Sequence, residues 1–248
     1  MGYDMDMSSL TPIVARPVNL TEQVLQRIQE SIIDRTLAPG ERVSEASIAT
    51  LLNVSKTPVR EALLMLRTIG LVEQTGTGRL QVLDPSPKRI RDAYEFRAVI
   101  ERAAAHDAAR RISAAAAEQL LDYAQDTVIM AKAQTGKGYR DTDRRFHLAV
   151  AAAATNEVMH AAVGNALVLT SALREREVPM AAEFVACAEE HLVIAQAVAD
   201  GRAGLAAETM DDHIRHVMEQ VLNPNRDEPA PPAKKRVGAR VPARVGRR

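Results

Sequence analysis

The sequence predicts a mainly α-helical protein: a small N-terminal domain with two short strands, followed by an all-α domain of six helices. Helical apolar periodicity runs through almost the whole of residues 89–222, whereas two short alternating segments occur only near residues 71–83. The 248 residues are 46% apolar but only 3% aromatic, with no tryptophan. An alanine-rich composition of this kind suits packed helices better than a β-sandwich.

The first expected helix covers residues 21–35, with Asn19 or Thr21 as its cap. A short helix over 44–52 follows, and residues 53–55 form a tight turn. Thr57-Pro58 then begins another helix, because the hydroxyl can cap free N–H groups and proline at the first helical position needs no donor. Apolar residues at three- and four-residue spacing continue this helix to Gly70, which ends it.

The start of this last helix is polar and basic. Arginine can bind guanine through two hydrogen bonds, and lysine and threonine reach phosphates or base edges. Two short helices joined by a tight turn suit a helix lying in the DNA major groove. The expected DNA-binding residues of the helix start are Ser55, Lys56, Thr57 and Arg60.

Residues 71–74 and 79–83 alternate like strands, and the glycine-rich stretch 75–78 joins them as a hairpin. The small residues at its tip let it approach a DNA backbone or minor groove, so we add Gly76, Gly78 and Arg79 to the DNA-binding set. The whole unit is therefore a predicted winged helix-turn-helix. An ordinary small α/β domain is the alternative, and the basic helix start together with the hairpin disfavours it.

The run Val-Ser-Lys-Thr-Pro-Val-Arg-Glu-Ala-Leu at 54–63, with Gly-Leu-Val at 70–72, resembles the N-terminal winged helix of GntR-type bacterial transcription regulators. The resemblance covers about residues 21–84. It departs from the common pattern at Lys56 and Ala46, where many members carry arginine.

The expected domain organisation is a mobile leader over 1–20, the winged helix over 21–84, a linker over 85–88, the helical domain over 89–222 and a disordered tail over 223–248. Two prolines mark the linker. The part of the tail from residue 224 carries 8 Lys/Arg against 2 Asp/Glu. It either attracts DNA phosphates or only solubilises the chain. The six expected helices cover 89–111, 114–134, 141–153, 156–177, 182–200 and 202–221.

Charge and cysteine usage restrict the class of protein further. The net charge is zero, so the winged helix must gather its cations on one face to bind DNA. A single cysteine, Cys187, excludes an internal disulfide and fits a reducing cytoplasm. The acidic start resembles no secretion signal, and no 18-residue apolar run is present, so we expect no membrane segment.

Four residues on three expected helices have metal-binding chemistry. Asp143 and His147 are four residues apart and share one helical face. His191 and His213 lie on later helices among apolar neighbours. If the three helices converge, one carboxylate and three imidazoles meet, a set that suits Zn²⁺, Ni²⁺ or Mn²⁺. Ordinary packing or surface histidines are the alternative, and His216 is the substitute ligand if the face is displaced by one turn.

The pattern Asp143-x-x-Phe-His147, with Glu-His191 and Met-x-x-His213, resembles the all-helical ligand-binding domain of the FadR subfamily, called the FCD domain. The resemblance implies a six-helix FCD-like bundle whose divalent metal is held by Asp143, His147, His191 and His213. His106 and His160 are expected to be surface or packing residues.

Arg97 lies among apolar neighbours on the first helix of this domain. A partly buried arginine suits capture of a carboxylate, so Arg97 is the predicted effector-binding residue. A structural ion pair with Glu101, four residues on, is the alternative.

The sequence therefore indicates a metal-containing, effector-responsive transcription regulator, expected to be a repressor and not an enzyme. Its expected partners are double-stranded operator DNA with a pseudo-palindromic sequence, a small carboxylate effector and a second copy of the chain. One alternative is a metal-dependent enzyme in which Glu189 or Glu190 activates water. Another is a bundle whose metal is purely structural.

Overall fold

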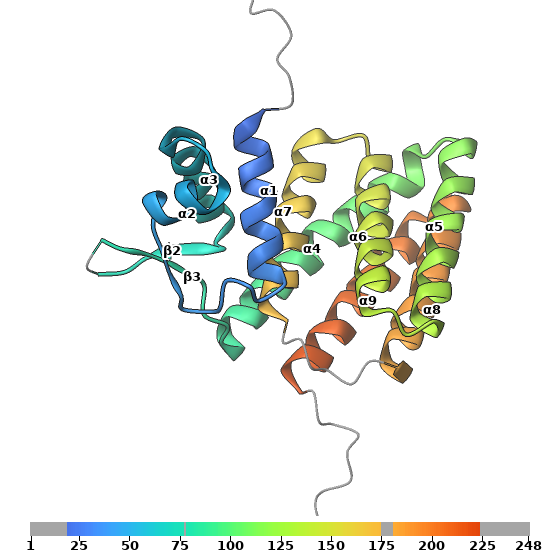
Figure 1. Ribbon diagram of the computed structural model, residues 1–248. Coiled ribbons are helices and arrows are strands. Elements are labelled where there is room, and N and C mark those ends of the chain that lie inside the picture. The colour runs from blue at the N-terminus through green and yellow to red at the C-terminus, as the bar shows by residue number, and fades with distance from the viewer. Residues whose placement is uncertain (1–18, 77, 175–180, 224–248) are drawn as a thin grey trace, which may run out of the picture.

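The computed structural model describes residues 19–76, 78–174 and 181–223. Within these ranges the chain forms nine helices and three short strands, so the expected mainly α fold is confirmed. Figure 1 shows the first three helices and the strands on one side of the molecule and the other six helices on the opposite side. No helix in these ranges is both long and apolar enough to cross a membrane.

The N-terminal domain contains α1 (Leu20–Ile33), α2 (Glu45–Leu52) and α3 (Lys56–Ile69). The Asn19 side chain accepts a hydrogen bond from the backbone N–H of Thr21 at 3.1 Å, so the predicted cap of α1 is confirmed. The three helices bury one apolar face each against a common core.

The start of α3 differs slightly from the prediction. Ser55, not Thr57, is the N-cap residue, and its side chain accepts no capping hydrogen bond. Thr57 and Pro58 lie inside the first turn, where the missing N–H of proline has no intrahelical partner to lose. Gly70 ends the helix with a φ of 88°, a left-handed conformation that costs glycine little.

The predicted hairpin is confirmed as β2 (Val72–Gln74) and β3 (Leu80–Val82), which pair antiparallel with Val72 opposite Val82. A further strand, β1 (Arg42–Val43), pairs with the other edge of β3, which gives the order β1-β3-β2. The sequence does not predict β1, because two residues are too few for an alternating pattern.

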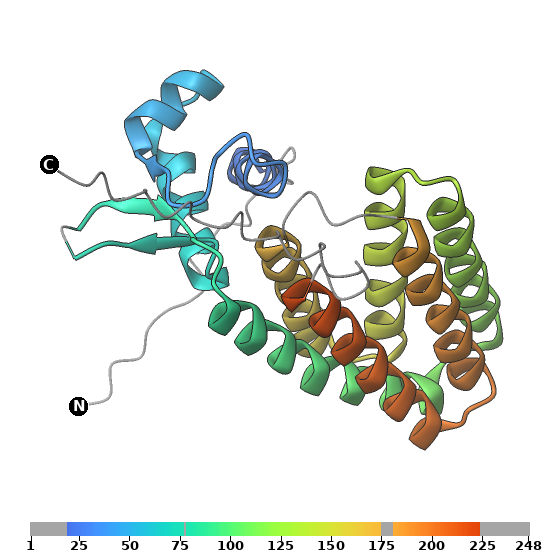
Figure 2. The ribbon, with the colours of Figure 1, turned by 90° about the horizontal axis from the view of Figure 1, so that it is seen from below.

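The second domain contains α4 (Pro87–Arg111), α5 (Ala114–Lys132), α6 (Gly136–Ala153), α7 (Glu157–Leu173), α8 (Ala181–Ala199) and α9 (Ala203–Leu222). Figure 2 shows α4 running from the hairpin along the bundle, with α9 beside it. One continuous buried core links the N-terminal domain with most of the bundle.

Two helix starts correct the prediction. The expected linker over 85–88 is shorter, because Pro87 occupies the first turn of α4 and Ser86 caps it by accepting from the N–H of Arg89 at 3.3 Å. Helix α6 begins at Gly136 and not at 141. Buried Tyr139 stacks on Phe184 with ring centroids 4.6 Å apart, and this packing holds the glycine-containing turn in the helix.

Helix α7 ends at Leu173, four residues before the predicted end, and residues 175–180 lie outside the described part of the chain. Almost all of the expected leader and tail also lies outside it.

Candidate functional site

Helices α6, α8 and α9 bring four of the predicted site residues together in the core of the bundle. Asp143 and His147 come from α6, His191 from α8 and His213 from α9, and one ligand atom of each lies within 4.8 Å of the other three. The three histidines are buried, with 0–2% of their surface exposed. The Oδ1 atom of Asp143 is 3.7 Å from His147 Nε2 and 3.6 Å from His191 Nε2.

Each of the three imidazoles has an oxygen atom beside its Nδ1. The Nδ1 atoms of His147 and His213 lie 2.5 Å from Glu101 Oε2 and 2.7 Å from Glu190 Oε2. His191 Nδ1 lies 3.1 Å from Thr127 Oγ1, whose own proton goes to the backbone carbonyl of Ala124. The Thr127 and Glu190 oxygens therefore accept, which assigns the imidazole protons of His191 and His213 to Nδ1. The Glu101 carboxylate, which can only accept, favours the same tautomer of His147 by its ion-pair contact with Nδ1.

This tautomer leaves a lone pair on every Nε2, and all three Nε2 atoms belong to the same group. His191 Nε2 and His213 Nε2 are 3.2 Å apart, but neither carries a proton to donate. Among the described residues, His147 Nε2 has no hydrogen-bond partner. Three converging lone pairs beside a carboxylate repel one another unless a cation lies between them. The arrangement therefore fits a divalent metal ion.

Burial favours the neutral form of His191 and His213. It lowers the pKa of His191 well below the ordinary value, and nearby His213 and His147 lower it further. Burial also lowers the pKa of His213, although the hydrogen bond to Glu190 opposes it. Neutral imidazole is the form that binds a metal, and three imidazole nitrogens with one carboxylate suit Zn²⁺, Ni²⁺ or Mn²⁺.

Arg97 lies behind this group and is 1% exposed. Its Nε donates to Glu101 Oε1, so the predicted alternative, an ion pair with Glu101, is present. Burial raises the pKa of Glu101, but Arg97 and His147 together lower it to about 2, so the carboxylate stays charged. Within the described part of the chain, Arg97 Nη2 has no hydrogen-bond partner, which leaves it available to an anion.

A second arginine, not predicted from the sequence, contacts the same tyrosine as Arg97, Tyr94. Arg174 follows α7, and its Nε donates to the hydroxyl of Tyr94 at 2.7 Å. The guanidinium carbons of Arg97 and Arg174 lie 5.9 and 6.0 Å from the centre of the Tyr94 ring. Burial lowers the pKa of Arg174, but Tyr94 and Asp143 raise it above the ordinary value.

The residues that orient the imidazoles were not predicted in this role. The sequence indicated Glu101 only as an ion-pair partner of Arg97, and Glu190 only as a possible general base. In the structure, Glu190 holds His213 through Oε2 and His216 through Oε1, at 2.7 and 2.6 Å. It is therefore not free to activate water. Thr127 gave no signal, because a lone threonine on an apolar helical face has no pattern of its own.

The predicted DNA-binding residues lie together on the N-terminal domain. Ser55, Lys56, Thr57 and Arg60 are all exposed along the first turns of α3. Arg60 forms two-atom hydrogen bonds with Glu45 of α2, with Nε–Oε1 and Nη2–Oε2 distances of 3.0 and 2.9 Å. The α2 carboxylate thus holds the guanidinium in a fork geometry at the start of α3.

Gly76, Gly78 and Arg79 are exposed at the turn of the hairpin. Gly78 has a φ of 78°, and its carbonyl accepts from Gln74 Nε2 at 3.1 Å. Arg67 of α3 donates to the Oε1 of the same glutamine at 3.2 Å, so the hairpin is tied to the C-terminal half of α3.

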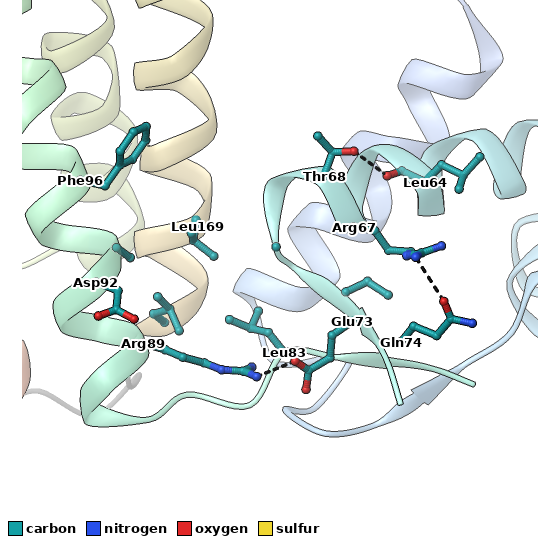
Figure 3. A pocket seen from close by; sticks show the side chains of 14 residues that line it. Leu64, Arg67, Thr68, Glu73, Gln74, Leu83, Arg89, Asp92, Phe96 and Leu169 are labelled. Carbon is teal, nitrogen blue, oxygen red and sulfur yellow. Dashed lines mark hydrogen bonds and ion pairs between the residues drawn. The ribbon is translucent and has the colours of Figure 1, made fainter. Parts of the chain in front are cut away.

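The two domains meet around a cavity of about 850 Å³ between α3, the hairpin, α4 and α7 (Figure 3). Arg89 of α4 crosses its edge to Glu73 of β2, with Nη2 and Oε2 2.5 Å apart. On another part of the junction, Arg35 Nη2 donates to the backbone carbonyl of Arg174 at 2.7 Å. The DNA-binding domain therefore has a direct contact with Arg174, whose side chain contacts Tyr94 as that of Arg97 does.

Two family models match the chain. Residues 20–81 match the bacterial regulatory proteins of the gntR family, and residues 92–216 match the FCD domain. The chain belongs to the GntR family. The gntR match spans α1 to β3, and the FCD match contains Asp143, His147, His191 and His213.

Relatives of this GntR-family chain are regulators rather than enzymes. It is 27% identical over 185 residues to the Nta operon transcriptional regulator of Aminobacter aminovorans, covering 74% of this chain and 86% of the relative. It is 24% identical over 206 residues to the transcriptional repressor RspR of Escherichia coli, covering 83% and 90%. The fold resembles that of E. coli McbR/YncC, with a TM-score of 0.71 at 18% identity over 82% of this chain and 99% of the other.

GntR-family regulators bind operator DNA and small-molecule effectors. This chain is accordingly a DNA-binding transcription regulator with an FCD effector domain.

Proposed function

We propose that this GntR-family regulator is a metal-containing repressor that responds to a small organic acid and binds a pseudo-palindromic operator as a homodimer. The observation that carries the proposal is the group Asp143, His147, His191 and His213, whose ligand atoms lie within 4.8 Å of one another beside two buried or half-buried arginines. The name of the relative RspR, a transcriptional repressor, favours repression.

The four side chains would hold the metal, and the bound cation would supply a Lewis-acid position for an oxygen of the effector. The chain itself supplies the opposite end of the site. Arg97 has Nη2 free of protein partners among the described residues, and Arg174 is fixed by Tyr94. A planar guanidinium binds a carboxylate through two hydrogen bonds, so this pair selects small acids over neutral ligands.

A homodimer follows from the geometry of DNA recognition. One winged helix reads only a half-site, and a two-fold symmetric pair matches a pseudo-palindrome. Ser55, Lys56, Thr57 and Arg60 would enter the major groove, and Gly76, Gly78 and Arg79 would approach the backbone or the minor groove.

The effector site is tested by thermal shift of the full chain against small mono- and dicarboxylates, before and after metal removal with a chelator. At a hundredfold excess over Kd, a bound acid stabilises by about 2.7 kcal/mol, which raises the Tm by about 5–11 °C for a chain of this size. We expect this shift to disappear after metal removal and in Arg97→Gln, which leaves the metal ligands intact.

Arg102→Ala is the matched control, because Arg102 is exposed on the same helix. A metal that raises the Tm while no acid shifts it would instead indicate a purely structural metal. An acid shift that survives Arg97→Gln would refute the role of Arg97.

The contact between Arg35 and Arg174 provides a route from the effector site to the DNA-binding domain. The Arg174 carbonyl accepts from Arg35, while its side chain binds Tyr94, three residues before Arg97. An acid that binds both Arg97 and Arg174 would therefore move Arg174, whose carbonyl holds Arg35 just after the end of α1. By linkage, the acid can weaken DNA binding only as far as it prefers the arrangement that does not bind DNA.

We expect Arg35→Ala to leave the affinity for the acid unchanged but to reduce its effect on DNA affinity. The coupling between effector and DNA is typically about 1–3 kcal/mol, and loss of a connecting contact removes about 0.5–2 kcal/mol of it. Operator affinity is measured with and without the acid by fluorescence anisotropy. Arg27→Ala, which replaces an exposed arginine of α1, is the control, and equal coupling in both variants would contradict this route.

A further inference from the structure

A second group of potential metal ligands lies next to the first. Cys187 and Glu190 are three residues apart on α8, and His216 faces them from α9. One ligand atom of each lies within 4.8 Å of the others. The spacing of three places the thiol and the carboxylate on one face of α8.

Hydrogen bonds join the three side chains. His216 Nδ1 lies 2.6 Å from Glu190 Oε1, and Cys187 Sγ donates to Gln220 Oε1 at 3.4 Å. Gln220 also places its Nε2 3.0 Å from His216 Nε2. Since an amide nitrogen only donates, His216 Nε2 accepts and Nδ1 carries the proton. Gln220 thus holds both ends of the group in place.

The group lies between solvent and the buried four-residue site. Cys187 is 2% exposed, whereas the side chains of Glu190 and His216 are 34% and 40% exposed. Glu190 belongs to both sites, because its other oxygen holds His213 Nδ1 at 2.7 Å. A ligand reaching this group from solvent therefore meets the outer oxygen of Glu190 and leaves the inner oxygen on His213.

We propose that Cys187, Glu190 and His216 form a second metal site, for a divalent cation that accepts sulfur ligands, such as Zn²⁺ or Co²⁺. A thiolate, a carboxylate and an imidazole are ligands that zinc combines in four-coordinate sites, and three protein ligands leave one position for water. Binding replaces the thiol proton of Cys187, which passes to solvent, by the metal–sulfur bond. This second site needs no effector, and its thiolate ligand distinguishes it from the four-residue site.

Cobalt(II) titration of the metal-stripped full chain tests the proposal, because thiolate coordination gives a charge-transfer absorption that imidazole and carboxylate do not give. We expect two equivalents of Co²⁺ per chain, one of them accompanied by the thiolate band. Cys187→Ser and His216→Ala should each lose the band and one equivalent. His160→Ala, an exposed histidine on α7, should retain both.

The two sites are separated by a further variant. His147→Ala removes a ligand of the first site and touches none of the second, so it should lose one equivalent and keep the thiolate band. If the unchanged chain binds one equivalent of Co²⁺ without the thiolate band, the second site is refuted and the first is unaffected. A band that persists in His216→Ala would also overturn the assignment. Circular dichroism establishes that each variant is folded.

Discussion

Replacement of His147 by alanine is expected to remove one equivalent of bound metal per chain. His147 Nε2 is buried and has no hydrogen-bond partner among the described residues, so its lone pair is available to a metal ion. Loss of a residue that only orients a ligand already costs about 10–100-fold in metal affinity. Loss of a ligand itself should cost more than about 100-fold, measured by elemental analysis after dialysis and by competition with a chelator.

Two further variants make this result interpretable. Asp143→Asn keeps the shape of the side chain and removes its charge, so it should also weaken metal binding without a large cavity. His160→Ala removes an exposed histidine and should change nothing. Full metal content with unchanged affinity in both His147→Ala and Asp143→Asn would contradict the proposed ligand set.

Replacement of Arg60 by alanine is expected to abolish specific operator binding and leave the fold intact. A bidentate arginine–base contact contributes about 1–3 kcal/mol of discrimination. A symmetric dimer uses it twice, so the loss is about 2–6 kcal/mol, or at least about 30-fold in affinity. Arg60 is exposed, and its ion pair with Glu45 is exposed too, so the Tm should hardly change.

The measurement is fluorescence anisotropy with a duplex that the unchanged protein enriches from a random pool. Arg102→Ala carries the same charge change on an exposed face of α4 and serves as the control. Glu45→Gln keeps Arg60 but removes the carboxylate that holds it, so it separates the presence of the guanidinium from its orientation. Unchanged affinity in Arg60→Ala would overturn the assignment of the first turns of α3 to the major groove.

Local sequence signals predicted most of the helices and the hairpin. The side chain of Asn19 caps α1, and Gly70 ends α3 because glycine adopts a left-handed conformation at little cost. One error occurred where longer-range packing decides the conformation. Gly136 and Gly138 predict a break between helices, but buried Tyr139 holds that turn in α6. A second error was local: Pro87 was predicted to lie in the linker, although proline is well suited to the first turn of α4.

The sequence by itself determined the types of the candidate ligands and the helices that carry them. Asp143 and His147 share a helical face because they are four residues apart, and Arg60 is exposed because the apolar stripe of α3 points elsewhere.

Only the tertiary structure decided that α6, α8 and α9 converge, and which oxygen lies behind each imidazole. Glu101 comes from α4, Thr127 from α5 and Glu190 from α8. The approach of Cys187 to His216, and of Arg174 to Tyr94, depends on the same packing. Periodicity describes which face of a helix is buried, but it does not specify which side chains of other helices that face will meet.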